Sequence, residues 1–205
     1  MREPRSAPVP RPPVVVGITG SSGAALARRA VEVLGELGIP VHLTYTPACR
    51  QVWPDEVGHP LNDDLAEWKR RYGLRIFNPE DFRAPISSGS FRTRGMIVIP
   101  CSMRTVSALA VGASSNLLER AADVVIKEGR PLVLVPRESP LSAIHLENLL
   151  KLARLGVRIV PPLPQFYLRP QSAEEMIDAM TRRALASLGI EGALPASQRW
   201  RGDEE

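Results

Sequence analysis

The chain has 205 residues, of which 44% are hydrophobic and 23% are charged, as in an ordinary globular protein with one hydrophobic core. The formal net charge of +4 comes with arginines scattered along the chain and no basic stripe interleaved with aromatic residues, so we expect no nucleic-acid partner. No run of about 18 apolar residues occurs, and the first residues lack the apolar stretch of a secretory signal. We therefore expect no membrane span and a cytoplasmic location.

The two cysteines, Cys49 and Cys101, are too few for a disulfide framework, and the three histidines form no zinc-binding pattern with them. We expect two free thiols and no metal. Cys101 is interpreted as structural, because the sequence places no histidine to activate it as a nucleophile.

Residues 1–12 place several prolines among charges, which predicts a disordered N-terminal tail. We expect a single domain over residues 13–190 and a C-terminal tail over residues 191–205.

The domain opens with a predicted strand, turn and helix. Residues 14–19 form a continuous, valine-rich run, typical of a strand buried on both faces of a parallel sheet. After the turn at residues 20–23, apolar residues recur at helical spacing up to Leu37, and Gly38 follows where a helix-ending glycine belongs. Residues 41–46 predict a second strand, which completes a right-handed βαβ unit.

The pattern weakens between residue 54 and about residue 85, where prolines and paired aspartates interrupt it. We expect an irregular excursion there, with one amphipathic helix around residues 65–72.

Regular elements return with predicted strands at residues 96–100, 131–136 and 157–160, and with helices around residues 105–111, 116–122 and 142–155. The last helix, at residues 172–188, has Ser172 as its N-cap, Glu175 at the third helical position and Gly189 at its end, which predicts a capping box. Strands that alternate with helices predict the α/β class, as a three-layer α/β/α sandwich around a parallel sheet.

Ligands of open α/β sheets bind beyond the carboxyl ends of the strands, so the segments that follow the strands are the candidate sites. Residues 17–23 hold glycines that allow close backbone approach before a helix N-terminus, which suits an anion. A tight turn needs such glycines for structural reasons about as often. A dinucleotide site would add an acidic residue after the second strand, where this chain has Thr44 and Thr46. This favours a mononucleotide over NAD(P), and the lack of a Gly-Lys-Ser/Thr sequence excludes the usual P-loop.

Residues 100–105 place two hydroxyls, a guanidinium and several backbone donors between a strand and a helix, which is typical of a phosphate cradle. A capped helix with an exposed arginine explains this segment equally well. Nearby, the hydroxyl-rich residues 87–90 are interpreted as a loop.

Arg137 and Glu138 fall at the carboxyl end of a predicted strand, where the sheet directs them toward a cleft. Residues 119–128 carry further charges, for which solvation is the usual explanation. After another strand, Tyr167 and Arg169 add a phenol and a cation.

Together these segments resemble the UbiX-type flavin prenyltransferases, over about residues 14–189. The matching stretches, in the family's order and spacing, are Gly17-Ile-Thr-Gly-Ser-Ser-Gly23, Ser88-Gly-Ser90, Pro100-Cys-Ser-Met-Arg-Thr105, Glu119-Arg-Ala-Ala-Asp-Val124, Lys127-Glu128, Arg130-Pro-Leu-Val-Leu-Val-Pro-Arg-Glu138 and Phe166-Tyr167.

This resemblance implies a Rossmann-like, flavodoxin-like flavoprotein that transfers a dimethylallyl group from dimethylallyl phosphate to N5 and C6 of reduced FMN. The product, prenylated FMN, is the cofactor of UbiD-type decarboxylases, which would be the partner that receives it. The family assembles as a dodecameric homo-oligomer with sites at subunit boundaries and uses no metal. Whether the donor is the monophosphate or the pyrophosphate, and which decarboxylase is served, stay open.

The resemblance also assigns roles to residues. Those implied to bind FMN are Gly20, Ser21, Ser22, Thr46, Ser102, Met103, Arg104, Thr105 and Arg137. Those implied to bind the prenyl phosphate are Arg120, Lys127, Glu138, Tyr167 and Arg183. The implied catalytic residues are Ser22, Glu56, Lys127 and Glu138, with Ser22 and Glu56 facing the reacting edge of the flavin.

The sequence departs from the family pattern at Pro47, where many relatives carry lysine, and at Ser21, where alanine is commoner.

An FMN-dependent cysteine decarboxylase acting on phosphopantothenoylcysteine is the nearest alternative enzyme, but it expects Pro-Ala-Ser-Ala-Asn-Thr at residues 100–105. A non-catalytic flavin-binding or delivery protein is the alternative from a different class. The enzyme is favoured by the intact set of Lys127, Glu138, Tyr167 and Arg183.

Overall fold

The structure is a computed structural model, and it describes residues 11–198. Most of the predicted N-terminal tail and the last part of the predicted C-terminal tail lie outside the described residues, and the single domain at residues 13–190 stays a prediction. Within the described range, no helix combines the length and apolarity needed to cross a membrane.

All six strands of the sheet are parallel, in the order β3-β2-β1-β4-β5-β6. The strands are β1 (Val14–Ile18), β2 (Val41–Tyr45), β3 (Arg75–Ile76), β4 (Gly95–Cys101), β5 (Leu132–Pro136) and β6 (Arg158–Ile159). The chain proceeds from β1 to β2 on one side, and β4 pairs with β1 on the other, so the strand order reverses at β1. A crevice for ligands is expected beyond the carboxyl ends of the strands at this reversal.

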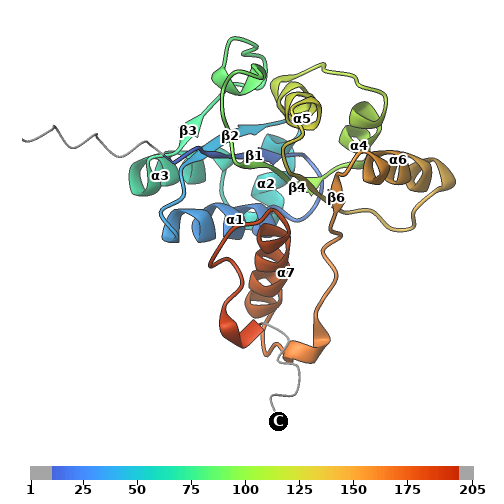
Figure 1. Cartoon of the computed structure of the whole chain (residues 1–205). Helices are drawn as coiled ribbons and strands as arrows, with labels where there is room; N and C mark the ends of the chain where they lie inside the picture. The colour runs from blue at the N-terminus through green and yellow to red at the C-terminus, as the bar shows by residue number, and fades with distance from the viewer. Residues whose placement is uncertain (1–10, 199–205) are drawn as a thin grey trace, which may run out of the picture.

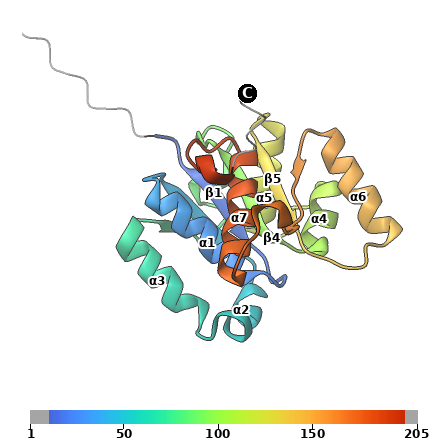
Figure 2. The ribbon, with the colours of Figure 1, turned by 90° about the horizontal axis from the view of Figure 1, so that it is seen from below.

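Helices cover both faces of the sheet (Figures 1 and 2). One face carries α1 (Ala24–Glu36), α2 (Cys49–Val57), α3 (Leu61–Tyr72) and α7 (Ala173–Ser187), and the other carries α4 (Met103–Ala110), α5 (Leu117–Lys127) and α6 (Ala143–Arg154). Short 3₁₀ turns lie at Pro85–Ser87, Phe166–Leu168 and Ala196–Gln198.

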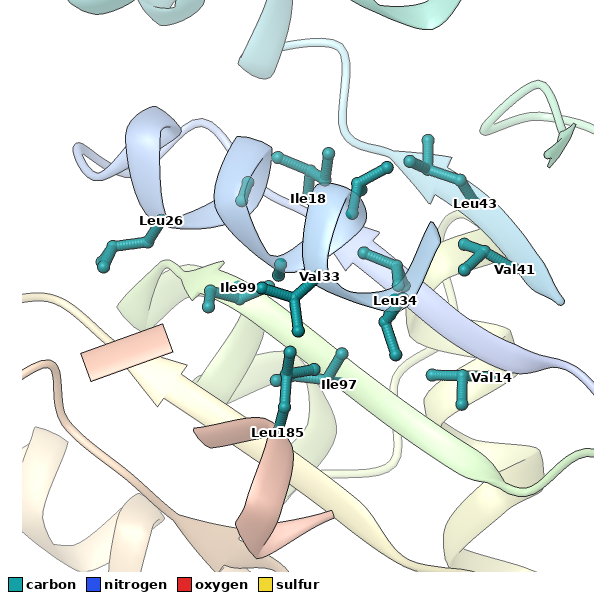
Figure 3. Packing of buried hydrophobic residues seen from close by; sticks show 14 of the residues in the cluster. Val14, Ile18, Leu26, Val33, Leu34, Val41, Leu43, Ile97, Ile99 and Leu185 are labelled. Atoms are coloured by element: carbon teal, nitrogen blue, oxygen red, sulfur yellow. The ribbon is translucent and has the colours of Figure 1, made fainter. Parts of the chain in front are cut away.

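Successive residues of each strand point to opposite faces, which divides the core into two clusters. In β4, Ile97 and Ile99 pack on the side of α1 and α7, as Figure 3 shows for Val33 and Leu185. Met96 and Val98 pack on the side of α4 and α5. Strands β1, β4 and β5 are buried on both faces, as their continuous apolar runs predict.

The predicted fold class is confirmed, with differences at element ends. Helix α5 continues to Lys127, beyond the predicted end at residue 122, because the segment that follows stays amphipathic and buries Val124 and Val125. Ser172 caps α7, accepting the N–H of Glu175 at 3.2 Å, but the Glu175 carboxylate accepts the N–H of Gln171 and completes no capping box with Ser172.

The prediction for residues 54–85 was incomplete. This region holds the end of α2, the whole of α3 and the edge strand β3, where the sequence pattern indicated one helix. Helix α2 continues through Pro54, which normally disfavours a helix interior. Tertiary packing overrides that preference, since Trp53 and Trp68 are almost fully buried with their rings edge to face at 5.9 Å.

Candidate active site

A cleft of about 500 Å³ lies beyond the carboxyl ends of β1, β2 and β4, where the strand order reverses. Five residues predicted to bind FMN line it: Gly20, Thr46, Ser102, Arg104 and Thr105.

Gly20 lets two backbone segments meet at the floor of this cleft. A Cβ atom added to Gly20 would lie 2.5 Å from the Cβ of Ala48, which leaves no space for a side chain. The Gly20 N–H donates to the Thr46 hydroxyl at 3.1 Å. The glycine is therefore required by the turn itself, and it also brings backbone N–H groups to the cleft.

Thr19, which the sequence did not single out, joins the ends of β1 and β4. Its buried hydroxyl donates to the Pro100 carbonyl at 2.8 Å and accepts the Ser102 N–H at 2.9 Å. This pair of bonds sets the start of α4 beside the turn after β1.

The first turn of α4 presents a helix N-terminus to the cleft. Ser102 is its N-cap, because the Ser102 hydroxyl accepts the Thr105 N–H at 3.3 Å. The Met103 side chain is buried in the core, so only its backbone is placed to face a ligand. Unpaired N–H groups and the helix dipole make such a terminus an anion site, which fits the predicted phosphate cradle.

The turn after β1 is also tied to the end of β5, two strands away. The Ser21 hydroxyl donates to the Arg137 carbonyl at 3.2 Å, and the Arg137 Nε donates to the Ser22 carbonyl at 3.3 Å. The guanidinium of Arg137 is thereby held beside the turn, with its two terminal nitrogens free of partners among residues 11–198.

Glu56 reaches this same turn from α2. Its Oε2 accepts the N–H groups of Gly23 at 2.8 Å and Ala24 at 2.7 Å, the first donors of α1. Burial raises the pKa of Glu56, but hydrogen bonds from Ser22, Gly23 and Ala24 and the charge of Arg137 outweigh it, so the net pKa lies below its usual value. Glu56 is therefore held as a carboxylate next to Ser22.

Arg120 and Lys127, which are predicted to bind the prenyl phosphate, lie on α5. This helix packs against the 3₁₀ turn at Pro85–Ser87. Arg120 donates to the Ser87 carbonyl at 3.2 Å and to Asp123 at 2.9 Å. Lys127 pairs with Glu128. Lys127 ends α5, a helix of 11 residues, so it lies roughly 16 Å along the axis from the cleft end of that helix.

Tyr167 and Arg183, predicted to bind the same phosphate, are exposed on the opposite side of the sheet. Figure 1 shows α7 and the turn at Phe166–Leu168 below the sheet, with α5 above it. Glu138 follows β5 at the carboxyl edge, where its carboxylate accepts the Ser139 N–H at 3.1 Å. One copy of the chain thus does not bring the five predicted phosphate-binding residues together.

Known proteins share this arrangement along nearly the full chain. The family model described as Flavoprotein matches residues 2–184. A flavin prenyltransferase UbiX from Halalkalibacterium halodurans is 46% identical over 194 residues, covering 92% of this chain and 93% of that protein. The chain belongs to the UbiX family of flavoproteins. Its expected identity as a flavoprotein is confirmed.

Two solved UbiX-family structures agree with the fold. A dodecameric FMN-dependent UbiX-like decarboxylase from Escherichia coli O157:H7 is 44% identical, with a TM-score of 0.84 over 92% of this chain and 99% of that chain. AnUbiX, solved in complex with FMN and dimethylallyl pyrophosphate, is 38% identical, with a TM-score of 0.85 over 94% of this chain and 99% of that chain.

In this UbiX-family chain the cleft has a second wall that the sequence did not reveal. It is formed by residues after β3 and at the start of α5: Pro79, Glu80, Ser115, Asn116 and Glu119. Glu119 is buried and accepts the Ser115 N–H at 2.8 Å and the Ser115 hydroxyl at 2.6 Å. Solvation, the usual explanation for the charges of residues 119–128, is therefore wrong for Glu119; its own N–H donates to Asn116, which caps α5.

Other features lie apart from the cleft. A larger hollow of about 630 Å³ between α1 and α7 is lined by none of the predicted site residues. Cys49 and Cys101 are both buried free thiols, and burial raises the pKa of Cys49 to about 12, so neither is placed as a nucleophile. Among residues 11–198 no group of three His, Cys, Asp or Glu side chains is placed to hold a metal ion.

Proposed function

We propose that this chain is a flavin prenyltransferase that transfers a dimethylallyl group from dimethylallyl phosphate to N5 and C6 of reduced FMN. The observation that carries the proposal is the cleft at the strand reversal, with the α4 N-terminus and Arg137 beside it, in a chain of the UbiX family. The complex of AnUbiX with FMN and dimethylallyl pyrophosphate supports both ligands.

The cleft fits FMN by size and by its donors. Its volume of about 500 Å³ lies within the usual range for small-molecule pockets. The α4 N-terminus, the Thr46 hydroxyl and the Arg104 side chain offer donors for a phosphate. We assign FMN binding to the predicted set of Gly20, Ser21, Ser22, Thr46, Ser102, Met103, Arg104, Thr105 and Arg137. Reduced FMN supplies the nucleophilic ring positions that accept the prenyl group.

The protein's own side chains stabilise the negative charge that develops on the leaving phosphate. Breaking an allylic C–O bond develops negative charge on the departing phosphate, and preorganised cations stabilise that charge more in the transition state than in the ground state. Arg120, Lys127 and Arg183 supply cations, and Tyr167 supplies a hydroxyl. Glu138 is assigned as the acid that protonates the phosphate.

We assign removal of the flavin proton, which is lost after ring closure, to the turn after β1. Glu56 is held as a carboxylate by N–H donors, and the Ser22 hydroxyl hydrogen-bonds to it. Ser22 therefore accepts a proton at its oxygen while passing its own to Glu56.

We propose that the donor site is completed between copies of the chain. Arg120 and Lys127 lie on the α5 side of the sheet, and Tyr167 and Arg183 lie on the α7 side. Side chains separated by the sheet reach one phosphate only if another copy contributes part of the set. A homo-oligomer, as a dodecamer, is consistent with the dodecameric relative from Escherichia coli.

We further propose that a UbiD-type decarboxylase receives the product, and that the protein acts in the cytoplasm. A reducing compartment suits both a reduced flavin acceptor and two free thiols.

Anaerobic single-turnover mixing tests this function. Protein loaded with reduced FMN is mixed with dimethylallyl phosphate, and released inorganic phosphate is measured. Phosphate release that requires reduced FMN and matches the flavin in amount supports transfer. Release without flavin overturns it, as does the release of neither phosphate from the monophosphate donor nor pyrophosphate from the pyrophosphate donor.

A further inference from the structure

A buried carboxylate links the three helices around Glu56. Asp64, on α3, is only 2% exposed. Its Oδ2 accepts the indole N–H of Trp53 at 2.9 Å and lies 2.8 Å from Nε2 of His59. Its Oδ1 lies 3.4 Å from Nε of Arg28 on α1. One side chain thus contacts α1, α2 and the segment after α2.

Glu56 lies between these contacts along the chain. Trp53 precedes it by three residues and His59 follows it by three, so Asp64 holds the chain on both sides of Glu56. The remaining anchors of α2 are few, because Cys49 and Trp53 are its only buried side chains. Arg28 lies one turn into α1, the helix whose first N–H groups the Glu56 carboxylate accepts.

We propose that Asp64 is a positioning residue, which fixes the Glu56 carboxylate against the N-terminus of α1 and the Ser22 hydroxyl. This inference rests on the proposed function, in which Glu56 takes the proton passed by Ser22. Asp64 itself contacts neither the cleft nor the turn after β1. It acts by locking α2 onto α1 and α3.

The negative charge of Asp64 is the property that anchors α2. This buried carboxylate accepts the Trp53 indole N–H and lies within ion-pair distance of His59 and Arg28, so its loss would leave a buried donor unpaired and remove the charge between these side chains. Asn in its place keeps the shape and one acceptor for Trp53, but it lacks the charge that His59 and Arg28 face. Helix α2 then loses part of its anchoring, and the Glu56 carboxylate is held less closely at the α1 N-terminus.

A double-mutant cycle on the transfer step tests this link. The variants are Asp64→Asn, Glu56→Gln and the two combined, measured as the single-turnover rate with saturating reduced FMN and donor. Glu56→Gln should slow transfer roughly 100-fold, the usual size of proton-transfer catalysis. Asp64→Asn should slow it about 10-fold, because a small misplacement of a catalytic group is costly. The double variant should be no slower than Glu56→Gln, since Asp64 acts only through Glu56.

Asp178→Asn is the matched control. This carboxylate pairs with Arg29 of α1 at 2.7 Å and with Arg182 of α7, and it does not contact α2. It should lower the melting temperature while the transfer rate stays unchanged. If Asp64→Asn prevents folding, Trp53→Phe takes its place in the cycle, because it removes one donor to Asp64 and keeps an aromatic ring against Trp68.

Additive losses in the cycle, an unchanged rate in Asp64→Asn, or an equal loss in Asp178→Asn would overturn the inference. An unchanged rate in Glu56→Gln would instead remove Glu56 from the proposed mechanism. The absence of transfer in the wild-type protein would reject the function itself.

Discussion

Ser21 and Arg137 hold each other's segments across the sheet, although 116 residues separate them in the chain. The Ser21 hydroxyl donates to the Arg137 carbonyl at 3.2 Å, while the Arg137 side chain donates to the carbonyl of the next residue, Ser22, at 3.3 Å. Because β4 lies between β1 and β5, these bonds pass over the end of β4 and hold the guanidinium of Arg137 beside the turn after β1.

Replacing Arg137 with alanine should weaken FMN binding. A charge-assisted contact to phosphate is worth about 1.5–3 kcal/mol, which corresponds to roughly a 10- to 150-fold loss of affinity. Quenching of flavin fluorescence on titration measures it. Arg71→Ala, on the exposed face of α3, is the matched control and should leave affinity unchanged. Equal affinities in the two variants would remove Arg137 from the flavin site.

Replacing Glu138 with glutamine should slow transfer without loss of flavin. The amide keeps the shape of the carboxyl group but has no proton to donate as a general acid, so we expect a loss of roughly 100-fold. Single-turnover rates with reduced FMN check this, with the exposed Glu67→Gln as control. A rate equal to that of the wild-type protein would show that Glu138 is not the acid.

Replacing Arg183 with alanine should impair use of the prenyl donor and leave FMN affinity unchanged. Arg183 is exposed on α7, where a surface charge is ordinarily worth little, so a large effect requires a ligand contact. We expect roughly a 10- to 150-fold weaker use of the donor, and only partial recovery with lysine, which lacks the bidentate fork.

Arg182→Ala provides the neighbouring control for Arg183. Arg182 is bonded to Asp178 at 2.7 Å, so its loss should lower stability and leave use of the donor intact. Donor use and FMN affinity that fall together in Arg183→Ala, or that both stay unchanged, would contradict the assignment.

Stability should fall between about pH 6.5 and pH 4 because of His42. Its ring is buried between Phe77 and Phe91, and burial, with the charge of Arg75, lowers its pKa from 6.5 to about 4. Between these two pH values His42 is protonated in the unfolded chain but neutral in the folded chain. Its contribution to the free energy of unfolding is therefore complete above the unfolded pKa and is lost as the pH falls toward the folded pKa.

Denaturant unfolding of the wild-type protein and His42→Phe, at one protein concentration, measures this term. Between about pH 7 and pH 5 the wild-type protein should lose about 2 kcal/mol more than the variant, which keeps an aromatic ring but cannot titrate. The same pH dependence in both proteins would show that His42 is protonated without cost in the fold.

The sequence predicted those parts of the fold that local pattern determines. The buried strands have continuous apolar runs in the sequence, and the N-cap Ser172 marks the start of the last helix directly. The α2–α3 region was predicted only in part, as one helix around residues 65–72, because its stability comes from long-range contacts. Trp53 meets Asp64 and Trp68 only after the chain folds, and Pro54 argues locally against the helix that contains it.

The site was predictable where residues follow strands directly. Gly20, Ser102 and Arg137 fall at strand ends, so the topology of the sheet gathers them. Thr19 and Glu119 were missed, since their roles come from bonds to Pro100 and Ser115 that no spacing reveals. The sequence also did not show that the residues predicted to bind the prenyl donor lie on both faces of the sheet, because that depends on the strand order.

Mass spectrometry of the flavin product tests the central claim most directly. The protein is incubated anaerobically with reduced FMN and dimethylallyl phosphate, and the released flavin is compared with that from a reaction lacking protein. The account predicts a flavin heavier by one five-carbon unit, formed only with protein, and formed far more slowly by Glu138→Gln. Recovery of unmodified FMN alone, with either the monophosphate or the pyrophosphate as donor, would contradict it.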